Sequence, residues 1–122
     1  MPPATRTSLR ENFPAPTASH IDDAVGRLLE SFSPVKIIVF GSVVRDRAQA
    51  GSDLDFLVVL PQVDNKREAA IAMRRSLSGL GVPVDVFVTT EQEIERRGWI
   101  KGTVLRAALE EGSVVYSASG AA

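Results

Sequence analysis

Cysteine is absent from this chain of 122 residues, and histidine occurs only once, at His20. The absence of thiols excludes disulfide bonds and thiolate metal sites, and nothing in the sequence points to an oxidising compartment. We expect His20 to be an exposed residue at the start of a helix, without a metal-binding or acid–base role. Any metal site in this protein must therefore be built from oxygen ligands.

The sequence also lacks an excess of charge of either sign, since its formal net charge is −1. Proteins that coat nucleic acids need surplus lysine and arginine to neutralise phosphates, so the charge argues against general nucleic-acid binding, although one nucleotide can still be a substrate. Long apolar runs are missing too, and stretches such as residues 56–60 are far too short to cross a bilayer. No signal-peptide pattern occurs at the amino terminus, and we expect a cytoplasmic protein.

The length of the chain is suited to a single domain with one core. Residues 1–17 contain Pro2, Pro3, Pro14 and Pro16 with little periodicity, which predicts a mobile or extended arm. We place the folded domain at residues 18–117 and a short tail at residues 118–122.

Within that domain, apolar periodicity and capping residues predict helices that alternate with strands, which is typical of an α/β (α+β) fold. Ser19 is the expected N-cap of the first helix, and Asn65 and Thr90 are expected to cap later ones. We expect Trp99 to belong to the core, with a partner-facing patch as the alternative, and Arg96 and Arg97 to form a solvated face rather than a nucleotide clamp. The predicted helices cover residues 20–32, 42–48, 66–80, 91–97 and 103–111, and the predicted strands cover residues 36–40, 53–60, 84–88 and 113–116.

Two aspartates interrupt the apolar strand predicted at residues 53–60. Asp53 and Asp55 stand at alternate positions, so both side chains project from the same face, about 7 Å apart along the strand. Two carboxylates at this distance repel each other unless a cation lies between them, and Mg²⁺ prefers such hard oxygen ligands. Alternatively, Asp53 caps a turn after Gly51 and Ser52, and Asp55 lies at a solvated strand end.

A third aspartate, Asp85, interrupts the next predicted strand. If the two strands are neighbours, this carboxylate can approach Asp53 and Asp55, because adjacent strands lie about 4.8 Å apart. Three carboxylates without a histidine are typical of phosphoryl-transfer sites that hold two metal ions.

The pair Gly41-Ser42 follows the first predicted strand. Glycine lets the backbone turn tightly and approach a ligand, and free amides at the start of a helix form an anion site. Nucleotide phosphates could bind there, with the Ser42 hydroxyl as a further donor. The alternative is a simple turn between a strand and a helix.

Ten residues separate Gly41-Ser42 from Asp53-Leu54-Asp55, and Asp85 lies on a later predicted strand. This arrangement resembles the signature of the polymerase-β-type nucleotidyltransferases. The small size resembles the minimal branch of that superfamily, which includes the antitoxins of HEPN/MNT toxin-antitoxin pairs. This resemblance implies a mixed β-sheet flanked by helices, two Mg²⁺ ions, and transfer of a nucleoside monophosphate from ATP or a related nucleotide.

Carried over by position, the resemblance implies that Asp53, Asp55 and Asp85 bind the metal ions and that Gly41 and Ser42 hold the triphosphate. Many relatives continue after Gly-Ser with Arg-Ala-Arg-Gly, whereas this chain continues with Val43, Val44, Arg45 and Asp46. Arg45 keeps the second basic position and either contacts a phosphate or is an exposed helix residue.

The acceptor of the nucleotide is expected to come from outside the chain, because no acceptor-binding domain fits after residue 90. In antitoxins of the resembling branch the partner is a HEPN-domain RNase toxin, which is adenylylated on a tyrosine and associates with the antitoxin in a hetero-oligomer. Two alternatives remain: a non-catalytic module that inhibits its partner by covering it, and a nucleotidyltransferase acting on a small molecule such as an aminoglycoside.

Overall fold

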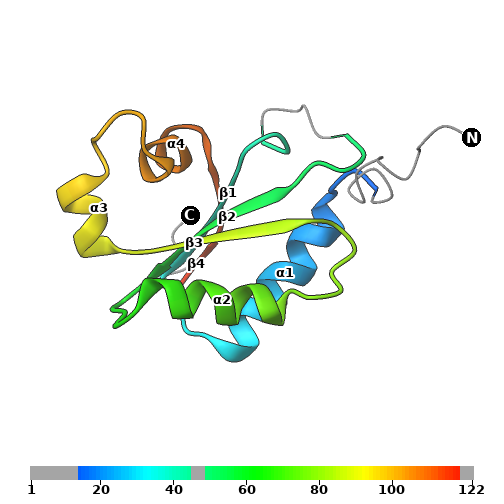
Figure 1. Cartoon of the computed structure of the whole chain (residues 1–122), viewed down its shortest axis with the longest axis horizontal. Helices are drawn as coiled ribbons and strands as arrows, with labels where there is room; N and C mark the ends of the chain where they lie inside the picture. The colour runs from blue at the N-terminus through cyan, green and yellow to red at the C-terminus, as the bar shows by residue number, and fades with distance from the viewer. Residues whose placement is uncertain (1–13, 45–48, 119–122) are drawn as a thin grey trace, which may run out of the picture.

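The computed structural model describes residues 14–44 and 49–118, and Figure 1 shows a single mixed β-sheet with helices on both faces. The strands are β1 (Lys36–Phe40), β2 (Leu54–Leu60), β3 (Val84–Thr90) and β4 (Ser113–Ser117), in the spatial order β3-β2-β1-β4. β1 is antiparallel to both β2 and β4, whereas β2 and β3 are parallel. The edges of the sheet are therefore β3 and β4.

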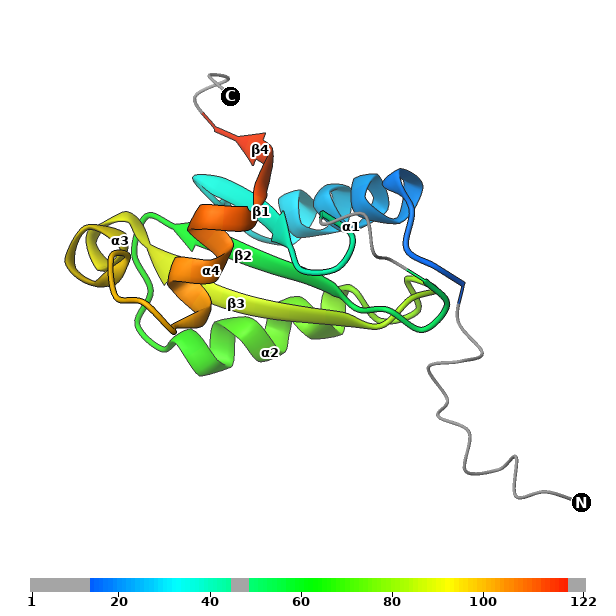
Figure 2. The same ribbon diagram turned by 90° about the horizontal axis from the view of Figure 1, so that it is seen from above.

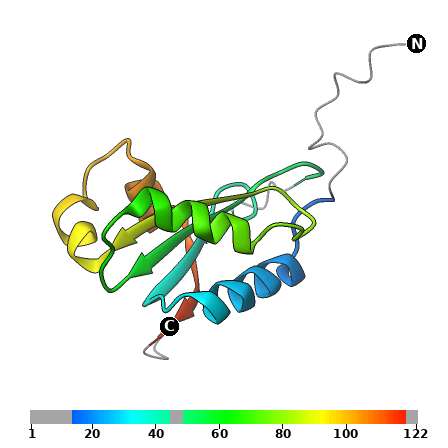
Figure 3. The same ribbon diagram turned by 60° about the horizontal axis from the view of Figure 1, so that its bottom comes forward.

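The helices are α1 (Ala18–Ser31), α2 (Lys66–Ser76), α3 (Glu91–Arg97) and α4 (Val104–Glu111). α1 and α2 lie side by side on one face of the sheet, as Figure 3 shows from below, and α4 lies on the other face, as Figure 2 shows from above. The larger core cluster lies between the sheet and the α1–α2 layer. It includes Ala24, Leu28, Ile37, Val39, Leu54, Phe56, Val58, Met73, Val86 and Val88.

A smaller core cluster fills the α4 face and contains Ile38, Phe40, Leu57 and Ala108. Leu57 in this cluster alternates along β2 with Phe56 and Val58 in the larger one, as expected for a strand that is covered on both faces. This alternation decides which side chains of β2 face α4.

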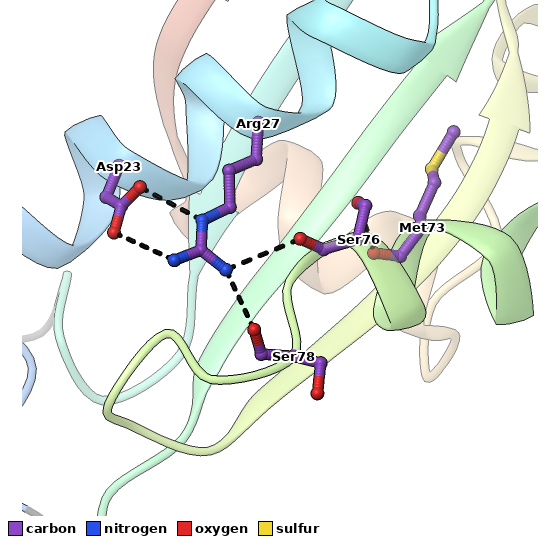
Figure 4. Close-up of polar contacts among 5 residues, drawn as sticks. All are labelled: Asp23, Arg27, Met73, Ser76 and Ser78. Carbon is purple, nitrogen blue, oxygen red and sulfur yellow. Dashed lines mark hydrogen bonds and ion pairs between the residues drawn. The ribbon is translucent and has the colours of Figure 1, made fainter.

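α1 is tied to the end of α2 by Arg27, as Figure 4 shows. The Arg27 guanidinium donates hydrogen bonds to the carbonyl oxygens of Ser76 at 3.4 Å and Ser78 at 2.8 Å, and it pairs with Asp23 on its own helix at 3.1 Å. Carbonyls at the end of a helix have no partner within the helix, so a cation there satisfies them and favours the helix dipole. The last turn of α2 is therefore fixed in place.

Most of the predicted elements are confirmed. β1 has the predicted bounds, and two helix caps accept hydrogen bonds as expected: Asn65 from the Glu68 N–H at 3.0 Å and Thr90 from Glu93 at 3.1 Å. Thr103, predicted as the first residue of its helix, is instead the N-cap and accepts from Arg106 at 3.1 Å. These local signals succeed because a cap depends only on residues three apart.

The N-cap predicted for α1 is wrong. Thr17, not Ser19, is the N-cap, and its backbone N–H donates to Nδ1 of His20 at 3.0 Å. His20 thus takes the place that Glu or Gln occupies in an ordinary capping box, a role that a sequence pattern based on acidic residues does not reveal. α2 also ends earlier than predicted, at Ser76.

The prediction that Trp99 belongs to the core is wrong as well. The Trp99 side chain is 69% exposed, and its indole N–H donates to the carbonyl oxygen of Arg96 at 3.0 Å. Arg96 and Arg97 are exposed, as predicted. Within the described ranges, none of the helices has the length and apolar character needed to cross a membrane.

Candidate active site

Gly41 and Asp55 lie against each other, although fourteen positions separate them in the sequence. The antiparallel register of β1 and β2 pairs Phe40 with Asp55, which places the residue after β1 beside the start of β2. Gly41 has a φ of +92°, and a Cβ atom at this position would collide with Oδ2 of Asp55. The backbone conformation favours glycine here, and a Cβ atom could be placed only if the Asp55 carboxylate moved aside.

The segment after Gly41 differs from its prediction. Residues 42–44 form a turn in which the Val44 N–H donates to the Gly41 carbonyl at 3.2 Å, so the helix predicted at residues 42–48 is not present in this part. Residues 45–48, and with them the predicted phosphate ligand Arg45, lie outside the described residues. β1 and β2 are antiparallel neighbours, and this pairing is what brings Gly41 to Asp55.

Asp53 and Asp55 lie on either side of Leu54, which is completely buried in the core on the α1–α2 side. Because side chains alternate along an extended chain, both aspartates face the opposite side, together with Leu57. Both residues are partly exposed. The carboxylates therefore lie on the α4 face of the sheet, at the start of β2.

Asp85 lies directly beside Asp55, because the parallel register of β2 and β3 pairs these two residues. Paired residues of neighbouring strands project from the same face. Oδ1 of Asp85 accepts hydrogen bonds from Nη1 of Arg74 at 3.1 Å and from the backbone N–H of Val86 at 2.9 Å. The third carboxylate is thus adjacent to the second in the backbone, while its oxygen Oδ1 contacts an arginine of α2.

The donor set fits Mg²⁺ in its chemistry and in its backbone register: three carboxylates, with Gly41 leaving space for the one in the middle. In the described part of the chain, however, no group of three or more His, Cys, Asp or Glu side chains is arranged to hold a metal ion. The aspartate side chains must therefore move before all three can bind one cluster of metal ions. Movement of Asp85 would alter its hydrogen bond with Arg74.

The face that carries the aspartates continues into an apolar floor and a small cavity. The rings of Phe40 and Phe87 lie 5.8 Å apart at an angle of 48°. Next to them is a cavity of about 180 Å³ between the sheet, α3 and α4. Its lining includes Leu57, Phe87, Thr103, Val104 and Leu105, together with Lys66, Glu93 and Arg97, and none of the three aspartates.

A larger hollow of about 640 Å³ lies at the opposite end of β2 and β3, lined in part by Lys66, Glu93 and Arg97. None of the three aspartates lines it either. Burial would raise the pKa of Glu93, but the hydrogen bonds from Lys66 at 2.7 Å and Thr89 at 2.6 Å outweigh it and hold the pKa below its usual value. This carboxyl group is a structural tie rather than a catalytic candidate.

The structure brings together Gly41, Asp55 and Asp85 of the predicted site residues, and it adds a contact with Arg74 that was not predicted. A basic residue in the last turn of a helix is an ordinary feature, since it favours the helix dipole. The sequence offers no signal that this arginine reaches the neighbouring strand, because that depends on how α2 packs against β3.

Comparisons with known proteins agree with this geometry. The family model described as a nucleotidyltransferase domain matches residues 21–115, which is most of the chain. A crystal structure from Sulfolobus solfataricus, described provisionally as a nucleotidyltransferase, has a similar fold with a TM-score of 0.59 at 21% identity, and the match covers 84% of this chain and 81% of that one. No curated protein is significantly similar to the chain. The chain therefore belongs to the family of nucleotidyltransferase domains and has the polymerase-β-like fold.

Proposed function

We propose that this protein is a Mg²⁺-dependent nucleotidyltransferase that transfers AMP from ATP to a hydroxyl group of a partner protein. The observation that carries the proposal is the close approach of Gly41 to Asp55 beside Asp85, since it joins the two halves of the sequence motif in one place. A turn that can approach phosphates thus adjoins carboxylates that can hold cations.

In this proposal Asp53, Asp55 and Asp85 hold the metal ions, and Gly41 and Ser42 position the triphosphate. Bound Mg²⁺ would supply charge neutralisation on the phosphates and favour deprotonation of the acceptor hydroxyl. The acceptor oxygen forms a bond to the α-phosphorus, the bond from that phosphorus to the bridging oxygen breaks, and pyrophosphate leaves with the electron pair while the hydroxyl proton passes to water. The contribution of the chain is positioning and electrostatic stabilisation.

A macromolecular acceptor is favoured by the shape of the aspartate face. None of the three aspartates lines this cavity of about 180 Å³ or the larger hollow of about 640 Å³, and all three are partly exposed, so the carboxylates lie on an open face. A protein that covers this face can bring its own hydroxyl to the carboxylates without a deep pocket. Together with the resemblance to minimal antitoxins, this supports a tyrosine of a HEPN-domain RNase toxin as the acceptor and an antitoxin role for this chain.

The role of the carboxylates is tested by Asp55→Asn, which keeps the shape of the side chain and removes its charge. We expect transfer to fall by at least about 100-fold, because one element of transition-state charge stabilisation is lost. Pyrophosphate release in the presence of ATP, Mg²⁺ and the acceptor measures this. Asp64→Asn, which changes an exposed aspartate at the other end of the sheet, is the matched control. An unchanged rate in Asp55→Asn would remove the proposed mechanism.

The acceptor is tested by incubating the protein with ATP, Mg²⁺ and a co-encoded HEPN toxin and weighing both chains. An increase in the mass of the toxin by one or more AMP groups, abolished by a Tyr→Phe change in the toxin, is the expected result. Association of the two proteins without any mass increase would instead support the steric module. A labelled antibiotic in the same assay would identify a small-molecule acceptor.

A further inference from the structure

Arg74 and Asp85 form an ion pair between the end of α2 and the start of β3. Nη1 of Arg74 lies 3.1 Å from Oδ1 of Asp85, and it also donates to the carbonyl oxygen of Val86 at 3.5 Å. Both side chains are 43% exposed. The arginine comes from the α1–α2 layer, whereas Asp85 belongs to the opposite face of the sheet, so the two meet around the free edge of β3.

The backbone hydrogen bonds show towards which side of β3 the contact lies. The Leu54 N–H of β2 donates to the carbonyl oxygen of Pro83 at 2.9 Å, so the backbone polar groups of residues 83 and 85 turn towards β2. Those of Val86 consequently turn the other way, to the free edge, because successive residues of a strand alternate. Oδ1 of Asp85 accepts from the Val86 N–H on that edge, and is therefore directed away from β2 and Asp55.

Arg74 is held where it can make this contact, because it lies in the last turn of α2. The carbonyls of Ser76 and Ser78 at this end of the helix accept hydrogen bonds from Arg27, and the Ser76 hydroxyl donates to the carbonyl of Met73 at 2.7 Å (Figure 4). The anchored turn limits the positions that the arginine side chain can reach.

We propose that Arg74 is a positioning residue that holds Asp85 at the outer edge of β3, away from Asp55, and competes with a divalent cation for this carboxylate. The inference rests on the proposed function, because it takes Asp85 to be a metal ligand. A guanidinium and a metal ion both need the negative charge of the carboxylate, so Asp85 must release Oδ1 from Arg74 to turn towards Asp55. The consequence is weaker binding of metal to the protein alone.

The test is the affinity for Mn²⁺, measured by electron paramagnetic resonance and calorimetry without nucleotide or acceptor. We expect Arg74→Ala to bind Mn²⁺ about two- to fivefold more tightly than the unaltered protein, the range that corresponds to loss of one exposed competing ion pair. Arg75→Ala removes a neighbouring exposed charge from the same helix and should leave the affinity unchanged. Arg74→Lys should restore competition, and circular dichroism checks that each variant is folded.

A double variant makes the result specific to the pair. In the Asp85→Asn background, Arg74→Ala should no longer change the Mn²⁺ affinity, because the carboxylate for which the arginine competes is gone. The inference is overturned if Arg74→Ala binds Mn²⁺ no more tightly than Arg75→Ala, or if it binds Mn²⁺ more weakly than the unaltered protein. It is also overturned if the effect of Arg74→Ala persists in the Asp85→Asn background, or if no variant binds Mn²⁺. Tighter binding without any nucleotide transfer would instead overturn the proposed function and leave the competition between Arg74 and Mn²⁺ established.

Discussion

At the scale of single residues, Gly41 contributes by having no side chain. Its positive φ favours glycine, and its closeness to Asp55 leaves no room for a Cβ atom unless that carboxylate moves. Gly79 also has a positive φ, of +78°, but a Cβ there would meet nothing within 4 Å. The two glycines therefore allow the backbone effect to be separated from the contact with the carboxylate.

We predict that Gly41→Ala and Gly79→Ala both lose about 1 kcal/mol of stability, because alanine is strained at positive φ. Only Gly41→Ala should also displace Asp55, and so lower both Mn²⁺ affinity and nucleotide transfer. Urea unfolding measures the first effect, and metal titration with pyrophosphate release measures the second. If Gly79→Ala impairs transfer as strongly as Gly41→Ala, the closeness of Gly41 to Asp55 has no special role.

At the scale of elements, α2 connects the helices around it to the edge of the sheet that carries the site. Its first residue, Lys66, pairs with Glu93 of α3 at 2.7 Å, and its end is bound by Arg27 of α1. The helix is therefore fixed at both ends, and Arg74 in its last turn reaches β3 from a defined position.

Loss of the α1–α2 tie should weaken the fold. We predict that Arg27→Ala lowers the free energy of unfolding by about 1 kcal/mol, because two carbonyl oxygens lose a charged donor. Arg75→Ala, which removes an exposed charge, should stay within about 0.5 kcal/mol of the unaltered protein. Urea denaturation of the three proteins provides the comparison, and equal stabilities would show that water replaces the guanidinium at no cost.

At the scale of the whole molecule, the sheet separates two regions of different character. One end of β2 and β3 carries Asp53, Asp55 and Asp85, and the other end carries the tie of Glu93 to Lys66 and Thr89. Thr89 is only 2% exposed, so this hydrogen bond also satisfies a buried hydroxyl. The Glu93 tie and the three aspartates therefore lie in separate regions of the sheet.

The lowered pKa of Glu93 makes one contribution to stability dependent on pH. A carboxyl group whose pKa is lower in the folded state stabilises the fold fully above its unfolded-state pKa, and this contribution is lost as the pH falls through the folded-state value. We therefore predict that the stability difference between the unaltered protein and Glu93→Gln is larger near pH 6 than near pH 3. Urea unfolding at both pH values tests this, with Glu95→Gln on the same helix as a control for the loss of an acidic side chain. A difference that is the same at both pH values would contradict the prediction.

Much of the fold follows from local sequence signals. Asn65 and Thr90 were predictable as caps at the start of their helices, because capping involves residues only three apart. The role of His20 as a capping partner could not be predicted, since histidine is an unusual residue at that position. The exposure of Trp99 was also missed, because burial depends on whether another element covers the residue.

Part of the candidate site could also be predicted, because it depends on the spacing of neighbouring residues. Asp53 and Asp55 share a face through simple alternation, and this can be inferred from the sequence alone. The pairing of Asp85 with Asp55 follows from the parallel register of β2 and β3, which the sequence allows but does not specify.

By itself, the sequence determined the strands and most of the helices and the spacing of glycine, serine and aspartates, because these depend on neighbours a few residues apart. Only the tertiary structure decided that β1 runs antiparallel to β2, that β3 lies at an edge, and that Arg74 reaches Asp85 around that edge. The physical reason is that strand order and edge position result from packing between distant segments, and the partner of a charged side chain depends on which surfaces this packing leaves open.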